Sequence, residues 1–61
     1  MKNATYIVIK DNTKKHPEKM VFKHGAENAY NYFYALVEQG LHPVCYRKNG
    51  MFGRVKEVTR G

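Results

Sequence analysis

The segment that determines the fold is residues 26–43, which read AENAYNYFYALVEQGLHP. When residues 26–39 are placed on a helical wheel, six apolar side chains gather on one side: Ala26, Ala29, Tyr30, Phe33, Leu36 and Val37. Gly40 suits the left-handed position that ends a helix, with the apolar Leu41 after it, and Pro43 prevents continuation. The pattern therefore predicts one amphipathic helix over residues 26–39.

Four segments around this helix have the composition of β-strands. Residues 5–10 and 19–23 precede it, and the polar, proline-containing loop 11–18 separates them. Residues 43–48 and 51–58 follow it. Asn49-Gly50 between these two suits a two-residue hairpin turn, because both residues tolerate a positive φ. The predicted order is strand, strand, helix, strand, strand, in a single domain over residues 1–61.

The helix connects the second strand to the third. A right-handed crossover makes those two strands parallel and leaves a gap that the first strand fills. The predicted fold is therefore an α+β two-layer domain: a four-stranded antiparallel sheet in the order 2-1-3-4, with one helix packed on one face. One helix covers only one face of such a sheet, so the other face meets water or a partner.

The hairpin turn predicts a register for the last two strands, because residues that pair across a hairpin share a face. With Asn49-Gly50 as the loop, the predicted pairs are Lys48–Met51, Arg47–Phe52, Tyr46–Gly53, Cys45–Arg54 and Val44–Val55.

Polarity then sorts the strand residues between the two faces, because arginine is rarely buried unpaired. The residues predicted to face the helix are Ile7, Ile9, Met20, Phe22, Val44, Tyr46 and Val55. The residues predicted to face outward are Tyr6, Val8, Lys10, Lys19, Val21, Lys23, Cys45, Arg47, Phe52, Arg54 and Lys56. All the charges in the outward set are positive.

The charge balance points to a class of partner. The chain carries eleven Lys and Arg against five Asp and Glu, a net charge of +6. A face of one sign attracts polyanions, and aromatic rings beside the cations stack on exposed bases. The first hypothesis is thus a non-enzymatic basic module that binds a polyanion, nucleic acid first. Its predicted contacts are Lys10, Lys19, Lys23, Arg47, Arg54, Lys56, Tyr6 and Phe52.

Two alternatives remain open. Lysines on an exposed sheet also deter edge-to-edge aggregation, which requires no ligand. The second functional hypothesis is a small phage-type inhibitor, antitoxin or adaptor that binds and blocks a host protein through an acidic patch on that partner. Tyr32 and Tyr34 flank the apolar side of the helix and are the predicted protein-docking residues, because tyrosine combines apolar area with a polar tip. An edge strand would allow a homodimer with either function.

Other function classes have little support in the sequence. No nucleophile, base and acid can be assembled into a catalytic centre. The soft ligands His16, His24, His42 and Cys45 lack the spacing of a tetrahedral metal site, so neither a metal nor a cofactor is expected. No apolar run approaches the roughly 18–20 residues of a membrane span. The single cysteine excludes an internal disulfide, which is typical of the reducing cytoplasm.

Overall fold

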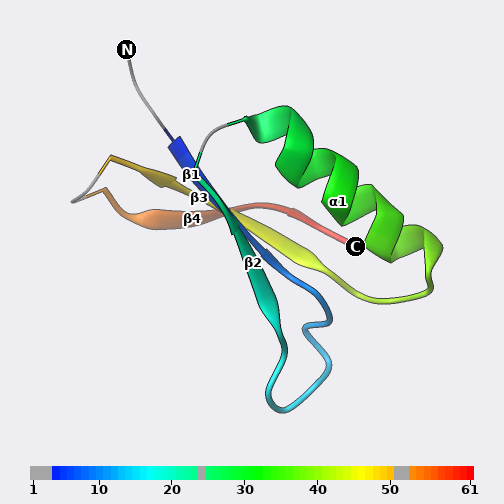
Figure 1. Cartoon of the computed structure of the whole chain (residues 1–61). Helices are drawn as coiled ribbons and strands as arrows, with labels where there is room; N and C mark the ends of the chain where they lie inside the picture. Colours follow the sequence, from blue (N-terminus) through cyan, green and yellow to red (C-terminus); the bar gives the residue numbers. More distant parts are fainter. Residues whose placement is uncertain (1–3, 24, 51–52) are drawn as a thin grey trace.

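The computed structural model describes residues 4–23, 25–50 and 53–61. These residues form β1 (Ala4–Ile9), β2 (Lys19–Phe22), α1 (Ala26–Glu38), β3 (Val44–Asn49) and β4 (Val55–Arg60). The strands make one sheet in the order β2-β1-β3-β4, and all neighbours are antiparallel. The helix packs along one face of the sheet (Figure 1). The predicted α+β fold and strand order are confirmed.

A glycine lies close to each end of the helix. Gly25 is its N-cap with a φ of 89°, and no side chain caps that end. At the other end Gly40 has a φ of 84°. The amide of Gly40 donates to the carbonyl of Val37 over 3.0 Å, and the amide of Leu41 donates to the carbonyl of Leu36 over 3.1 Å. These two bonds form a Schellman motif, so the prediction that Gly40 takes the left-handed position at the end of the helix is confirmed.

The hydrophobic core lies between α1 and the two central strands. It consists of Val8, Ala29, Phe33, Leu36 and Cys45. Phe33 is only 1% exposed, and it packs in one cluster with Val8 of β1 and Cys45 of β3, both fully buried. Small side chains on the strands leave the volume that the phenyl ring of Phe33 occupies. The core therefore depends on fitting one large helix residue onto small strand residues.

On the two central strands, the prediction grouped the residues correctly into two faces but assigned each group to the wrong side of the sheet. Val8 and Cys45, expected to face outward, pair with each other and lie in the core. Tyr6 lies on the same side and packs against that core. Since side chains alternate along a strand, Ile7, Ile9, Val44 and Tyr46 lie on the face away from the helix. On β2 the prediction holds for Phe22, which packs against the core.

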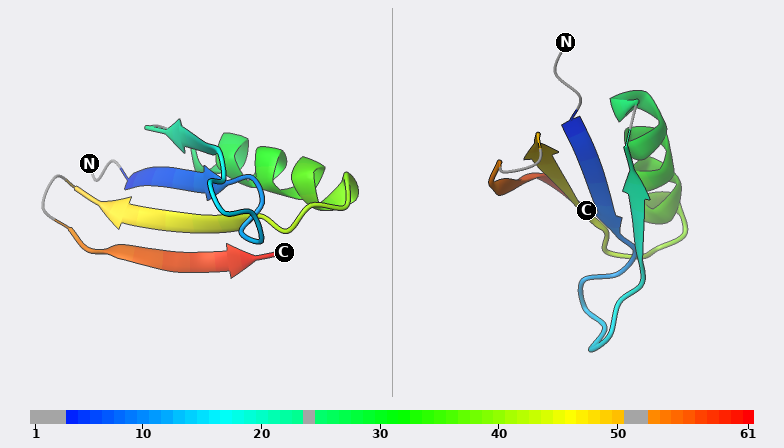
Figure 2. Two further views of the ribbon diagram at one scale, coloured as in Figure 1. Left: turned by 90° about the horizontal axis from the view of Figure 1, so that it is seen from below. Right: turned by 60° about the vertical axis from the view of Figure 1, so that its left-hand side comes forward.

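The polarity argument failed because α1 covers only part of its face. Among the described residues α1 packs against β1, β2 and β3 but not β4. Figure 2 shows the helix running along β1 and β2 while β4 forms the opposite edge of the sheet. Arg47 therefore lies on the helix side of β3 and is still exposed. An arginine on the helix side need not be buried, so it does not indicate which face is open.

The hairpin register also differs from the prediction. Lys48 pairs with Val55 instead of Met51, and Arg47 pairs with Lys56. In the remaining positions Tyr46, Cys45 and Val44 pair with Glu57, Thr59 and Arg60, with a bulge between Cys45 and Tyr46. β4 thus begins at Val55, and the predicted strand residues Met51 and Phe52 lie outside the described residues.

Gly53 explains why the connection between β3 and β4 is longer than predicted. A Cβ on Gly53 would lie 1.7 Å from the carbonyl oxygen of Asn49, so only glycine fits this close approach. Gly50 has the positive φ of 67° expected in a turn. The chain therefore closes between Asn49 and Gly53, where sequence alone predicted closure between Lys48 and Met51. From Lys48 to Tyr46, before the bulge, the register moves by four residues, an even number, so Arg47 and Lys56 still share a face.

Candidate functional site

The sheet face opposite α1, called the far face from here on, is covered by no helix or strand of the described chain. The strand registers arrange it in three rows across the sheet. The first row is Val21, Ile7, Tyr46 and Glu57. The second is Lys19, Ile9, Val44 and Arg60, and the third is Thr5, Lys48 and Val55. Apolar side chains thus occupy most of the two central strands and one position on each edge strand, whereas the charged side chains lie on the edge strands and, as Lys48, near the end of β3.

The far face is most accessible on its edge strands, whereas Val44 on the central strand β3 is fully buried. Val21 is 46% exposed and Val55 is 50% exposed. Ile7 and Tyr46, which face each other on the central strands, are half-buried. Sequence reasoning missed these residues as functional candidates because it placed Ile7 and Tyr46 under the helix. The signal that could have found them is size, since the small Val8 and Cys45 fit beneath Phe33 better than isoleucine and tyrosine do.

The margin of the far face is basic. Its one carboxylate, on Glu57, is paired with Arg60, whose Nε lies 3.0 Å from the Glu57 Oε1. Lys19 and Lys48 remain, and no ion pair found in the described part of the chain includes them. The net charge of the far face is therefore positive around an apolar centre.

The eight predicted anion-binding residues do not form one surface. Lys10, Arg47, Lys56 and Tyr6 lie on the helix side, whereas Lys19 lies on the far face. Tyr6 packs edge-on against Tyr30 at a centroid distance of 5.8 Å, so its ring is not an open stacking platform. Lys23 and Arg54 are exposed just outside β2 and β4. Phe52 lies outside the described residues.

The two predicted docking tyrosines have different environments. Tyr32 is half-buried and packs against Phe22 of β2 at 5.7 Å between ring centroids. Its ring closes one side of the core. Tyr34 is 59% exposed, with one edge-on contact to Phe33 at 5.3 Å. Of these two tyrosines, Tyr34 offers the more accessible ring.

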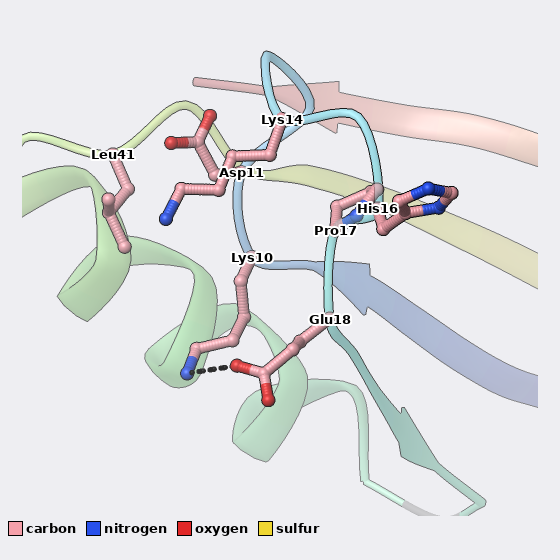
Figure 3. Close-up of a pocket in the computed structure, with 7 residues that line it drawn as sticks. All are labelled: Lys10, Asp11, Lys14, His16, Pro17, Glu18 and Leu41. Carbon is pink, nitrogen blue, oxygen red and sulfur yellow. Dashed lines mark hydrogen bonds and ion pairs between the residues drawn. The ribbon is translucent and has the colours of Figure 1, made fainter.

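A pocket of about 310 Å³ lies beside the loop between β1 and β2. Figure 3 shows its lining residues, with Lys10 and Glu18 pointing toward each other. The Lys10 Nζ lies 3.2 Å from the Glu18 Oε1. The Asp11 carboxylate accepts hydrogen bonds from the hydroxyl of Thr13 at 2.6 Å and its amide at 3.0 Å. These bonds lower the pKa of Asp11. Both carboxylates thus interact with neighbouring loop residues, which favours a structural role for this pocket.

The remaining candidate reactive groups are the cysteine and the possible metal ligands. Cys45 is buried, and burial raises the pKa of its thiol, which disfavours the nucleophilic thiolate. Within residues 4–23, 25–50 and 53–61, no three histidine, cysteine or acidic side chains are grouped so that they could hold a metal ion. In the same part of the chain, no helix has the length and apolar composition that crossing a bilayer requires.

In comparisons with known proteins, no family model, no curated protein and no solved structure matches this chain. The functional interpretation therefore depends on the geometry of its own surfaces.

Proposed function

We propose that this protein is a small non-enzymatic binding module that docks onto another protein through its far face. The observation that supports the proposal is an apolar sheet surface left uncovered in a chain of 61 residues. So small a domain has little apolar surface to spare for its own stability. A contiguous uncovered apolar patch with a polar margin is typical of an interaction site.

The far face also indicates the chemistry of the partner. Protein interfaces have an apolar, aromatic-rich centre and a polar margin. Tyr46 and Ile7 would form that centre, and tyrosine is among the residues that contribute most to binding energy. Lys19 and Lys48 at the margin match acidic side chains on the partner. We therefore infer a partner surface that combines an apolar patch with an acidic margin.

A module with these properties acts by occupying a surface. It would serve as an inhibitor that blocks a site on its partner, or as an adaptor that brings the partner to another molecule. A second copy is a poorer occupant of the far face, because two such faces would place Lys19 and Lys48 of both copies against each other. The homodimer predicted from the edge strands is a separate arrangement and remains a prediction.

Binding of nucleic acid by the far face has weaker support. That hypothesis required cations and stacking rings on one open face. Tyr6 instead packs against the core, and Arg47 and Lys56 lie on the other side of the sheet.

The test uses matched valine variants. Val21→Ser and Val55→Ser change exposed valines on the far face, and Val37→Ser makes the same change on the helix, where the valine is 41% exposed. The tagged chain is incubated with nuclease-treated lysate of its source cell, and the recovered protein is identified, purified and titrated with each variant by calorimetry. Circular dichroism checks that each variant is folded.

We expect each far-face variant to weaken binding about fivefold, because it removes apolar area from the docking surface, and Val37→Ser to leave binding within about twofold. The proposal is wrong if the valine on the helix matters as much as those on the far face.

A further inference from the structure

The molecule leaves a second surface uncovered, on the helix side of the sheet. Within the described residues α1 does not pack against β4, so side chains on the helix side of β4 and the adjoining part of β3 project beside the helix. Figure 2 shows β4 at the edge of the sheet away from α1. We call this surface the ledge and define it by Arg47, Lys56, Tyr30 and Tyr34.

The floor of the ledge carries two adjacent positive charges. Arg47 and Lys56 pair directly across β3 and β4, and both are exposed. Directly opposed residues on antiparallel strands have Cβ atoms about 4.5–5.5 Å apart, where like charges destabilise the pair. The ion pairs found among the described residues are Lys10–Glu18 and Glu57–Arg60, and neither neutralises these two cations. An anion bound between the two side chains would relieve this repulsion.

Tyrosines of α1 form the wall of the ledge. Tyr30 packs against Tyr6, and Tyr6 is the cross-strand neighbour of Arg47. Burial raises the pKa of the Tyr30 phenol, whereas the positive charge of Arg47 acts to lower it, so the guanidinium lies within electrostatic reach of the helix. Tyr34 follows one turn later on the same side of the helix and is 59% exposed. A cationic floor and an exposed aromatic ring thus both lie near Tyr30.

We propose that the ledge binds a single-stranded nucleic acid, with Arg47 and Lys56 on its phosphates and the ring of Tyr34 stacked on a base. The planar guanidinium of arginine matches the oxygens of a phosphate, and the lysine adds a second charge. Aromatic side chains beside such cations stack on bases whatever their sequence. An acidic protein segment would pair with the two cations, but it would offer no base to stack on the exposed tyrosine ring.

This inference does not rest on the proposed docking through the far face, because the two surfaces lie on opposite sides of the sheet. The helix side of β3 carries Arg47 and its far side carries Tyr46 and Lys48. A protein partner and a nucleic acid would therefore not compete for the same residues.

The test compares two double variants that lower the net charge equally. Arg47→Gln with Lys56→Gln removes the floor of the ledge, and Lys14→Gln with Lys15→Gln removes two exposed loop cations. Fluorescence polarisation with a fluorescein-labelled oligothymidine is measured over a series of salt concentrations. Removing two phosphate contacts should reduce the slope of log K against log salt by about 1.4, since each contact to a single strand contributes about 0.7. The loop variant should keep the original slope.

A third variant tests the aromatic wall. Tyr34→Leu keeps an apolar side chain without a stacking ring, and we expect it to weaken oligothymidine binding about tenfold. Unlabelled polyglutamate serves as the competitor that offers charge without bases, and it should displace the oligonucleotide poorly. The proposal is overturned if the chain does not bind oligothymidine at low salt, if both double variants lose equal affinity, if Tyr34→Leu has no effect, or if polyglutamate competes as well as unlabelled oligothymidine.

Discussion

The two sides of the central sheet differ in an unexpected way. Beneath α1 the sheet presents Val8 and Cys45, both fully buried, whereas the far face presents the larger Ile7 and Tyr46 beside the exposed Val21. On the central strands the residues directly beneath Phe33 are therefore smaller than Ile7 and Tyr46 on the other side, while the larger Tyr6 and Phe22 pack at the border of the core. The comparison shows that fit to Phe33 determined which face was covered, and that the uncovered face retained apolar residues that a purely solvent-facing surface does not need.

The largest effect should come from removing the residue that defines the covered side. Phe33→Ala deletes a ring that is 1% exposed, and such truncations typically cost about 3–5 kcal/mol. Because a 61-residue domain has a small reserve of stability, we expect the variant to be largely unfolded at 25 °C. Urea titration followed by circular dichroism measures this. Tyr34→Ala is the neighbouring control and should change the free energy of unfolding by less than about 1 kcal/mol, and equal losses in the two variants would contradict the core described above.

A matched valine pair sharpens the comparison between the two faces. Val8→Ala should lower the free energy of unfolding by about 2 kcal/mol, because the valine is fully buried under the helix. Val21→Ala removes the same two methyl groups from a residue that is 46% exposed and should cost about 0.5 kcal/mol. Urea midpoints at two protein concentrations give both values. Equal costs would mean that the far face is covered in solution.

The left-handed end of the helix should have a smaller effect. Gly40 has a φ of 84°, and a Cβ there would meet no atom within 4 Å. Gly40→Ala therefore introduces backbone strain without a clash, which should cost about 1 kcal/mol. Gly40→Asn should cost less, because asparagine tolerates this conformation better. Thermal unfolding measures the stability of the two variants. An alanine variant as stable as the original chain would show that the left-handed conformation at Gly40 causes no strain.

The smallest effect is expected in the loop between β1 and β2, which belongs to neither face. Hydrogen bonds from Thr13 lower the pKa of Asp11 below its unfolded value of about 3.9. The ionised carboxylate therefore stabilises the fold above that unfolded value, and this stabilisation is lost as the pH falls through the lower folded value. Asp11→Asn should melt slightly below the original chain at pH 7, and the gap should close in acid. Melting temperatures across the pH range measure this, with Glu38→Gln as the exposed control. A gap independent of pH would exclude the carboxylate as its cause.

Much of the fold, but less of the candidate site, could be predicted from the sequence. The alternation along β1 correctly placed Tyr6 on the same face as Val8 and opposite Ile7, and the hairpin prediction correctly placed Arg47 and Lys56 on one face, although it paired Arg47 with Phe52. Assigning those sets to a side required knowing how far the helix extends over the sheet. The residues of the predicted cationic face are therefore dispersed, with Lys19 on the far face and Arg47 and Lys56 on the ledge, and the apolar residues of the far face were missed.

Local sequence patterns are enough to predict the helix, its end before Gly40, and the order of the strands, because these follow from periodicity, backbone freedom and the handedness of one crossover. Two other features depend on contacts in the folded chain: which side of β1 and β3 lies beneath the helix, and where the hairpin closes. The first depends on fitting Phe33 over Val8 and Cys45, and the second on the close approach of Gly53 to the Asn49 carbonyl. Both are contacts between residues whose fit in space cannot be read from their order along the chain.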